Sequence, residues 1–458
     1  MYVSSHAESS TTMTSPDEEA QRSSCQSWAA PDGGYGWVVT TSVAVINGHS
    51  WGISAAYSVF LAHYLRSGTY PGATSLMYAM IGSLSIGVTL LMSPLVVIMA
   101  RKLGTRPTML IGAALQSASL VCASLSTRIW HLFLSQGVLF GTGMGLLFLP
   151  SYGIVSQWFT TRRALANGIA IAGAGLGGCT YSLAVGAMIQ NMSLEWAYRI
   201  LAVVSAAANI TCTLLIRTRH GESQQRRLAF DVLLFKKVEY LLILGFGAFN
   251  ALAYFVLIFT LANYANVIGL GSSQASLIPA LFMLGQAIGR PAIGGLSDRF
   301  GRINITLLMT FVAGVFSLVV WINAKTFAVL ILFALIVGLT AGVFWVNAAP
   351  VLVEVMGMQN LSSGLSIPWL AIAALCTFSA PIALQIYAGT GSYLGAQLFA
   401  GFMFVASALC MFVLRGWKVA RGSDNGGDIM SPGGSGDGKT RSRQSISWAR
   451  GCFTLEVV

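Results

Sequence analysis

Long apolar stretches recur along almost the whole 458-residue chain, and they constrain its fold more than any other feature. A helix that crosses a membrane needs about 20 consecutive, mainly apolar residues. Twelve stretches meet this requirement, and the longest internal polar segment separates six of them from the other six. Only 9% of the residues are charged, whereas soluble proteins average about 25%. The sequence therefore predicts an all-α polytopic membrane protein.

The twelve predicted transmembrane helices form two six-helix halves. Their approximate bounds are 36–62, 75–100, 107–126, 130–157, 164–190, 196–216, 239–265, 274–296, 303–324, 326–353, 364–389 and 393–415. The chain divides into an N-terminal tail, a six-helix bundle, a central loop, a second six-helix bundle and a C-terminal tail, at 1–35, 36–216, 217–238, 239–415 and 416–458. Both tails are polar and are expected to be disordered.

Basic residues are distributed unequally between the two sides of the predicted bundle. One side carries the run after Arg415 and also Arg101, Lys102, Arg106, Arg162, Arg163, Arg217, Arg219, Arg226, Arg227, Lys236, Lys237, Arg299 and Arg302. The other side carries Arg66, Arg128, Arg199 and Lys325. Because cytoplasmic loops are enriched in Lys and Arg, both termini are expected in the cytoplasm, and the net charge of +11 does not indicate nucleic-acid binding. No organelle signal is visible, so the plasma membrane is the expected location.

The two halves share an internal repeat. Three residues of the first half recur 197 positions later at the same topological place, as the pairs Gly72/Gly269, Pro94/Pro291 and Gly104/Gly301. Two related six-helix halves around a central binding site are a known plan of secondary transporters.

The most specific motif is "GRPAIGGLSDRFGR", which ends at Arg302. Asp298 is placed where a helix meets the cytoplasm, and Arg299 and Arg302 are placed to pair with a neighbouring helix end. Such a cluster is expected to latch one side of the molecule in one conformation and to break in the other; topological charge alone is the alternative. The first-half copy, "ARKLGTR", has Arg101 in place of Asp298, and it also carries Arg106.

Two further motifs carry a family resemblance. "PDGGYGW" (31–37) precedes the first span, and "WFTTRRALANGIAIAGAGLGG" (158–178) opens the fifth. They resemble the span-1 and span-5 signatures of the monocarboxylate-porter family of the major facilitator superfamily, in its fungal-type branch, although Trp158 and Thr161 depart from the pattern. The matching residues include Asp32, Gly33, Gly34, Trp37, Arg162, Arg163 and Gly168. Within the second motif, Gly173 and Gly177 form a small-xxx-small face for helix packing.

Arg290 is the one unambiguous charge inside a predicted span, and intramembrane charge marks function by default. The family resemblance implies that Arg290, followed by Pro291, binds a substrate carboxylate; a snorkelling structural Arg is the alternative. One turn earlier, where the family has an Asp, this chain has Gln286, and Ala55 lies near the family's span-1 Lys. The usual proton symport is therefore not implied. Proton coupling through His49 or Glu354, exchange, and the absence of coupling remain open.

Other polar and aromatic residues are expected at cavity depth, although each taken alone is more typical of a packing contact between helices. With Arg290 and Gln286, the candidate substrate-binding residues are His49, Asn47, Tyr254, Asn250, Asn347 and Trp369. Together they indicate a partly aromatic cavity beside one cation.

These patterns predict a secondary transporter that moves a small organic solute, a monocarboxylate-like or other organic anion, by alternating access. Export of a secondary metabolite is the alternative, and a non-transporting sensor is a weaker one. The expected partners are the solute, the lipid bilayer and, where coupling exists, protons. The sequence shows neither paired carboxylates nor a cluster of His and Cys residues. We therefore expect no enzymatic activity, no metal site and no cofactor.

Overall fold

The computed structural model describes residues 32–67, 70, 72–219, 236–357 and 361–426, and the statements below concern these residues. The predicted tails up to residue 31 and from 427, and most of the central loop, lie outside them. The regular structure in the described part is helical, as the sequence predicts.

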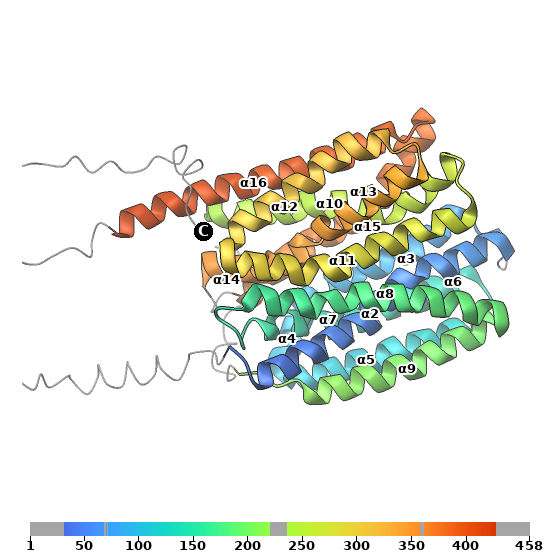
Figure 1. Ribbon diagram of the computed structural model, residues 1–458. Coiled ribbons are helices and arrows are strands. Elements are labelled where there is room, and N and C mark those ends of the chain that lie inside the picture. Colours follow the sequence, from blue (N-terminus) through green and yellow to red (C-terminus); the bar gives the residue numbers. More distant parts are fainter. Residues whose placement is uncertain (1–31, 68–69, 71, 220–235, 358–360, 427–458) are drawn as a thin grey trace, which may run out of the picture.

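The helices follow one another in two sets (Figure 1). The first set comprises α2 (Tyr35–Ser67), α3 (Ser75–Leu91), α4 (Ser93–Leu103), α5 (Thr105–Ser124), α6 (Ile129–Leu132), the π-helical turn η1 (Phe133–Leu139), α7 (Phe140–Val155), α8 (Arg163–Asn191) and α9 (Leu194–Leu215). The second set comprises α10 (Val238–Val267), α11 (Ser272–Phe300), α12 (Arg302–Phe316), the π-helical turn η4 (Ser317–Trp321), α13 (Phe327–Ala341), α14 (Val343–Met356), α15 (Leu361–Thr390) and α16 (Leu394–Gly426).

The lengths of these helices agree with the predicted spans. Nine helical segments of the described residues are long and apolar enough to cross a membrane, and α3 and α4, which meet at 48°, form a tenth as a bent pair. The other two predicted spans correspond to the helices α2 and α15. These helices have 33 and 30 residues, which is more than the about 20 that a bilayer requires.

The last helix corrects one prediction about the C-terminal tail. Residues 416–426, predicted to be disordered, continue α16 beyond Arg415. Ion pairs hold this extension: Lys418 binds Glu354, and Arg421 lies 3.9 Å from Glu239 while its guanidinium covers the ring of Trp417.

The internal repeat is visible in the backbone. Gly104 ends α4 with φ 90°, and Gly301 ends α11 with φ 93°. Gly72 and Gly269 likewise have φ values of 77° and 87°. Positive φ is readily adopted only by glycine, so the same turns recur where the sequence predicts the repeat.

Glycines bring α8 very close to α2. A Cβ on Gly173 would lie 2.6 Å from the carbonyl carbon of Ala44, and one on Gly177 would lie 2.7 Å from that of Gly48. The small-xxx-small face predicted from the sequence is therefore confirmed. On its other side α8 packs along α11, where a Cβ on Gly168 would lie 3.0 Å from the carbonyl carbon of Arg290 (Figure 1). Helix α8 thus belongs to the first half and borders the second.

Candidate functional site

Arg290 is buried in the middle of α11, with 5% of its surface exposed. Its Nη1 donates a hydrogen bond to the carbonyl of Ile171 on α8 at 2.8 Å. Its Nη2 donates to the Tyr254 hydroxyl at 3.1 Å and to the side-chain amide oxygen Oε1 of Gln286. All these acceptors are neutral, and the Nε–H has no acceptor in the described part of the chain. Because a buried charge without a counter-charge is costly, this guanidinium is suited to bind an anion.

The neighbours of Arg290 fix its position. Gln286 lies one turn earlier on the same helix face, and the Tyr254 hydroxyl donates to Gln286 Oε1 at 2.7 Å. Gly342, at the break between α13 and α14, lies against the side chain of Arg290, because a Cβ there would be 3.0 Å from Nε. The predicted pair of Gln286 and Arg290 is thus brought together with Tyr254.

Aromatic side chains from both halves fill the space beside this triad, and we call Trp51, Phe148, Tyr152, Trp345 and Trp369 the central aromatic cluster. The ring of Trp51 lies 5.2 Å from Phe148 and 5.6 Å from Trp345. Trp345 stacks on Trp369, with ring centroids 5.5 Å apart and planes 10° apart. The Tyr152 hydroxyl donates to the carbonyl of Trp345 at 2.8 Å, so the cluster joins the first half to the second.

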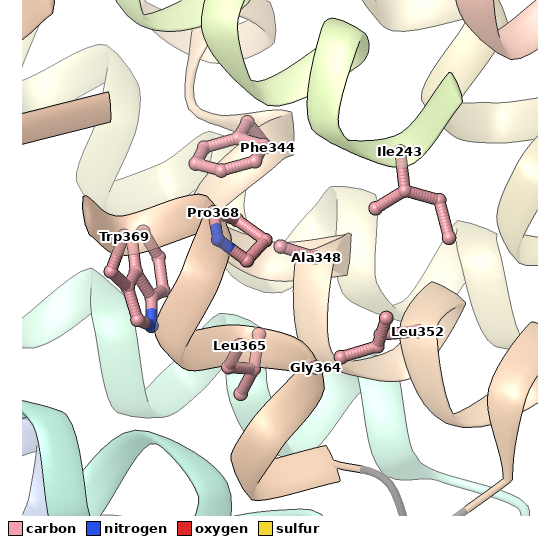
Figure 2. A pocket seen from close by; sticks show the side chains of 8 residues that line it. All are labelled: Ile243, Phe344, Ala348, Leu352, Gly364, Leu365, Pro368 and Trp369. Carbon is pink, nitrogen blue, oxygen red and sulfur yellow. The ribbon is translucent and has the colours of Figure 1, made fainter. Parts of the chain in front are cut away.

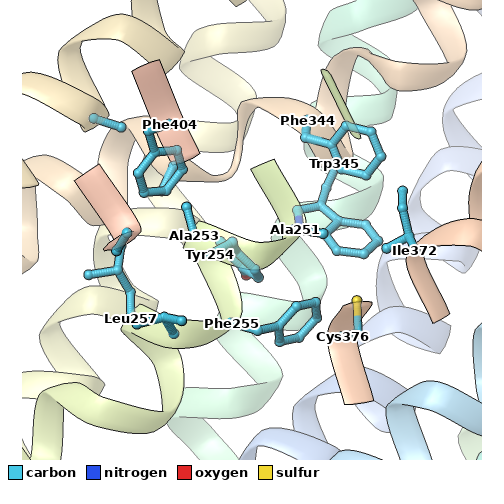
Figure 3. Packing of buried hydrophobic residues seen from close by; sticks show 14 of the residues in the cluster. Ala251, Ala253, Tyr254, Phe255, Leu257, Phe344, Trp345, Ile372, Cys376 and Phe404 are labelled. Atoms are coloured by element: carbon cyan, nitrogen blue, oxygen red, sulfur yellow. The ribbon is translucent and has the colours of Figure 1, made fainter. Parts of the chain in front are cut away.

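Figure 3 shows the second-half side of this region, where Tyr254 and Trp345 lie near Phe255 and Cys376. The rings of Tyr254 and Trp345 are 6.0 Å apart. Asn250 lies one turn before Tyr254 on the same face of α10. Of the predicted binding residues, the structure therefore joins Tyr254 directly to Arg290 and Gln286, and Trp369 through Trp345.

A narrow apolar pocket adjoins the cluster within the second half (Figure 2). It is lined by Ile243, Phe344, Ala348, Leu352, Gly364, Leu365, Pro368 and Trp369. Phe344 contacts both Trp345 and Trp369, with ring centroids 5.2 and 5.8 Å apart. The pocket therefore extends the aromatic region with an apolar surface.

The other predicted binding residues make contacts elsewhere. Asn47 donates to the carbonyl of Ala170 at 2.9 Å, and Asn347 donates to the hydroxyls of Ser297 and Thr306. His49 bonds the carbonyl of its own helix residue Val45 and lies edge-on to Tyr181. These contacts hold helices together, and none of them involves Arg290.

Trp51, Phe148 and Trp345 were not among the residues predicted from the sequence. For the two tryptophans, the signal in the sequence was their position along the predicted spans. Tryptophan in membrane helices is enriched at the two interfaces, yet Trp51 lies in the middle of α2 and Trp345 lies far from both ends of the span Phe327–Met356. These two positions are therefore not those of interface anchors.

Asp298 joins the two halves at the end of α11. Its carboxylate accepts hydrogen bonds from the backbone N–H groups of Ala164 and Leu165, at 3.1 and 2.8 Å, in the first turn of α8. A helix N-terminus favours a negative charge. Arg302 donates to Asp298 Oδ1 at 3.0 Å and to the carbonyl of Thr160 at 3.0 Å. We call these contacts the α8–α11 clamp.

Asp32 binds the same segment from within the first half. Its carboxylate accepts hydrogen bonds from the N–H groups of Thr160 and Thr161, at 2.7 and 3.0 Å, and from the Thr160 hydroxyl. Burial alone would raise the pKa of Asp32, but these hydrogen bonds outweigh burial and place its pKa below the usual value. Gly34, with φ 58°, forms the turn after Asp32 and Gly33, and Trp37 contacts Phe159. The two family motifs therefore contact each other.

The remaining predicted gate and motif residues differ in their contacts. Arg299 is exposed and covers its neighbour Phe300, so of the two predicted arginines it is Arg302 that joins the clamp; Arg302 also lies 3.7 Å from Glu354. Arg106 donates to the carbonyl of Ile216 at 2.7 Å, and Arg163 donates to that of Phe159 at 2.9 Å. Arg101 is half-buried at the end of α4, and Arg162 is exposed.

Replacing Asp298 by alanine is expected to separate the halves at the clamp. Two charge-assisted hydrogen bonds contribute about 1.5–3 kcal/mol each, so their loss should shift the ratio of closed to open molecules at least about tenfold. Spin labels at the exposed positions Arg162 and Arg299, with native cysteines replaced, would measure the distance between the two halves. In Asp298→Ala a larger fraction of the molecules should show a long distance between the labels. Asp32→Ala is the control, because Asp32 binds the same segment from its own half. A distance distribution unchanged by Asp298→Ala would contradict the clamp.

Comparisons with known proteins agree with this architecture. A family model described as Major Facilitator Superfamily matches residues 39–249 and 241–429. The probable transporter MCH2 of Saccharomyces cerevisiae is 31% identical over 401 residues, which cover 85% of this chain and 84% of that protein. Monocarboxylate transporter 3 of Rattus norvegicus is 40% identical over 143 residues, which cover 31% of this chain and 29% of that protein.

A solved structure supports the fold. The proton:xylose symporter XylE bound to 6-bromo-6-deoxy-D-glucose matches with a TM-score of 0.64 and 14% identity, over 84% of this chain and 95% of that chain. Family and relatives are transporters rather than enzymes. The helical halves, the motif contacts and the matched family lead to one conclusion: this multi-pass membrane protein belongs to the major facilitator superfamily, as a transporter of the monocarboxylate-porter type.

Proposed function

We propose that this transporter carries a small organic anion, and that Arg290 binds its carboxylate. The observation that carries the proposal is the buried guanidinium whose partners, Ile171, Tyr254 and Gln286, are all neutral. A planar guanidinium can bind a carboxylate through two parallel hydrogen bonds. A bound carboxylate would supply the counter-charge and an acceptor for the unpartnered Nε–H.

Binding can be coupled to alternating access through the same residue. Arg290 belongs to α11, and its Nη1 donates to the Ile171 carbonyl on α8. A carboxylate that takes Nη1 would compete with this contact between the halves. Loss of this contact would weaken the packing of α11 on α8, and the α8–α11 clamp joins the same two helices at one end of the molecule. The clamp would then open and close with substrate binding, since packed interfaces switch between discrete arrangements.

We place both termini and the clamp in the cytoplasm and the protein in the plasma membrane, because the basic residues gather on that side of the bundle. In this arrangement residues 36–216 and 239–415 form the two bundles, and 217–238 form the loop between them. Protons remain a candidate coupling ion, although Glu354 is paired with Arg302 and Lys418.

Solute counterflow in proteoliposomes tests the proposal. Vesicles loaded with one unlabelled carboxylate should accumulate the same labelled carboxylate only when they contain the protein. The same vesicles with and without an imposed pH gradient separate proton symport from exchange. Failure of every carboxylate in a panel that runs from lactate to benzoate would contradict an organic-anion carrier.

Export of a larger metabolite is the second candidate, and the central aromatic cluster favours it because four of its five rings come from Trp and Phe side chains suited to a bulky solute. Growth on candidate acids, compared with metabolite retention in a deletion strain, separates uptake from export.

A further inference from the structure

We infer that the transported anion is an aromatic carboxylate that carries a second hydrogen-bond acceptor on or beside its ring. The inference rests on the proposed function, in which Arg290 binds the carboxylate. It adds the chemistry of the rest of the solute, which is read from side chains that contact one another around Arg290.

The first observation is a set of unpartnered polar groups. In the described residues, four side chains around the triad have buried polar atoms without a hydrogen-bond partner: Arg290 at Nε, Trp51 and Trp345 at the indole Nε1, and Asn250 at both amide atoms. Buried donors are normally hydrogen-bonded, and each exception requires an explanation. A bound solute with acceptors for the N–H donors and a donor, its own or a water, for the Asn250 carbonyl oxygen would explain all of them together.

The second observation is that these groups adjoin one another. The Trp51 and Trp345 rings are 5.6 Å apart, and Trp345 lies 6.0 Å from Tyr254, which accepts a hydrogen bond from Arg290. Asn250 lies one turn from Tyr254 on the same face of α10. The unpartnered groups are therefore linked to Arg290 through the contacts of Tyr254, Trp345 and Trp51.

The third observation is the aromatic wall itself. Trp345 and Trp369 are stacked, and Trp51 and Phe148 contact them from the first half. Aromatic rings prefer offset-stacked or edge-to-face neighbours. A flat aromatic ring inserted here would exchange contacts between the protein's own rings for contacts between those rings and the solute. The adjoining pocket in Figure 2 offers an apolar surface for substituents of the solute.

A short aliphatic acid does not match this set of groups. A three-carbon carboxylate would occupy Arg290 but would leave the indole N–H groups unpartnered and the rings uncovered. A site built to hydrogen-bond a solute discriminates against analogues that lack the acceptor. The ring and the second acceptor are therefore both part of the inferred solute.

Competition among three matched carboxylates tests the inference. Benzoate and cyclohexanecarboxylate differ in aromaticity, and pyridine-3-carboxylate adds a ring-nitrogen acceptor to the shape of benzoate. Each would compete with labelled benzoate counterflow into proteoliposomes that contain the full chain. We expect pyridine-3-carboxylate to compete best, benzoate next and cyclohexanecarboxylate worst. The concentration needed for half-inhibition should differ by up to about tenfold from each compound to the next, because each pair differs by one hydrogen bond or one aromatic contact.

Tryptophan-to-phenylalanine variants identify the donors. Trp51→Phe and Trp345→Phe keep an aromatic ring and remove the N–H, so together they should abolish the preference for pyridine-3-carboxylate over benzoate. Trp321→Phe is the matched control: its Nε1 is also buried and unpartnered, but its ring packs on Phe333, away from the cluster. The readout is a ratio of two solutes in one variant, so it does not depend on how much protein folds.

The outcomes separate this inference from the proposed function. Equal competition by benzoate and cyclohexanecarboxylate, or an unchanged preference in the double variant, would overturn the aromatic, acceptor-bearing solute and leave Arg290 as the anion site. Transport that ignores all carboxylates would overturn both.

Discussion

Arg290→Gln is expected to reduce carboxylate counterflow about 10- to 100-fold, because a hydrogen bond to a charged group contributes about 1.5–3 kcal/mol and about 1.4 kcal/mol corresponds to tenfold. Glutamine retains polar atoms and removes the charge. The guanidinium has no carboxylate partner in the described structure, so its removal leaves no unpaired buried charge behind. We therefore expect transport to fall far more than thermal stability.

Two further substitutions make this result specific. Arg290→Lys keeps the charge but loses the planar fork that binds a carboxylate through two bonds, so its activity should lie between wild type and Arg290→Gln. Arg299→Gln removes an exposed arginine from the same helix, outside the clamp, and should retain wild-type transport. Wild-type counterflow in Arg290→Gln would remove Arg290 from the binding site.

Gly173→Ala is expected to cause the largest loss of stability among single-methyl substitutions in α8. The added Cβ would lie 2.6 Å from the carbonyl carbon and 2.9 Å from the Cα of Ala44. These are backbone atoms that cannot rotate away, so α2 and α8 must separate. Overpacking of a tight interior costs about 1–3 kcal/mol, occasionally more.

The same helix provides the control for this prediction. A Cβ on Gly186 meets nothing within 4 Å, and alanine is the better helix former by up to about 1 kcal/mol. Gly186→Ala should therefore be neutral or slightly stabilising in a thermal unfolding assay followed by size exclusion. Equal melting of the two variants would show that the α2–α8 contact is not as close as described.

The fold could be predicted from the sequence because each span is a local property. Twenty apolar residues form a helix in a membrane whatever surrounds them, and the glycine spacing of α8 predicted its packing face. Arg290 could be identified because a charge in an apolar span is costly on its own. These predictions needed no knowledge of which helices become neighbours.

The rest of the site depends on long-range contacts that no local pattern contains. Trp51 and Trp345 meet although they belong to opposite halves of the chain. Arg299 and Arg302 looked equivalent in the sequence, yet Arg299 lies in the last turn of α11 and Arg302 begins α12. The turn at Gly301 separates them, and only after this turn does an arginine reach the Thr160 carbonyl just before α8. Asp32 was predicted only as part of a motif, and its bonds to Thr160 and Thr161 depend on the packed loop.

The central claim, that Arg290 binds an anion, is tested most directly by titrating purified protein with benzoate and benzamide, which have nearly the same shape and differ in charge. Wild type should bind benzoate at least about tenfold more tightly than benzamide, and Arg290→Gln should lose this preference. Equal affinity of wild type for the two compounds, or a preference for benzoate that persists in Arg290→Gln, would contradict the claim.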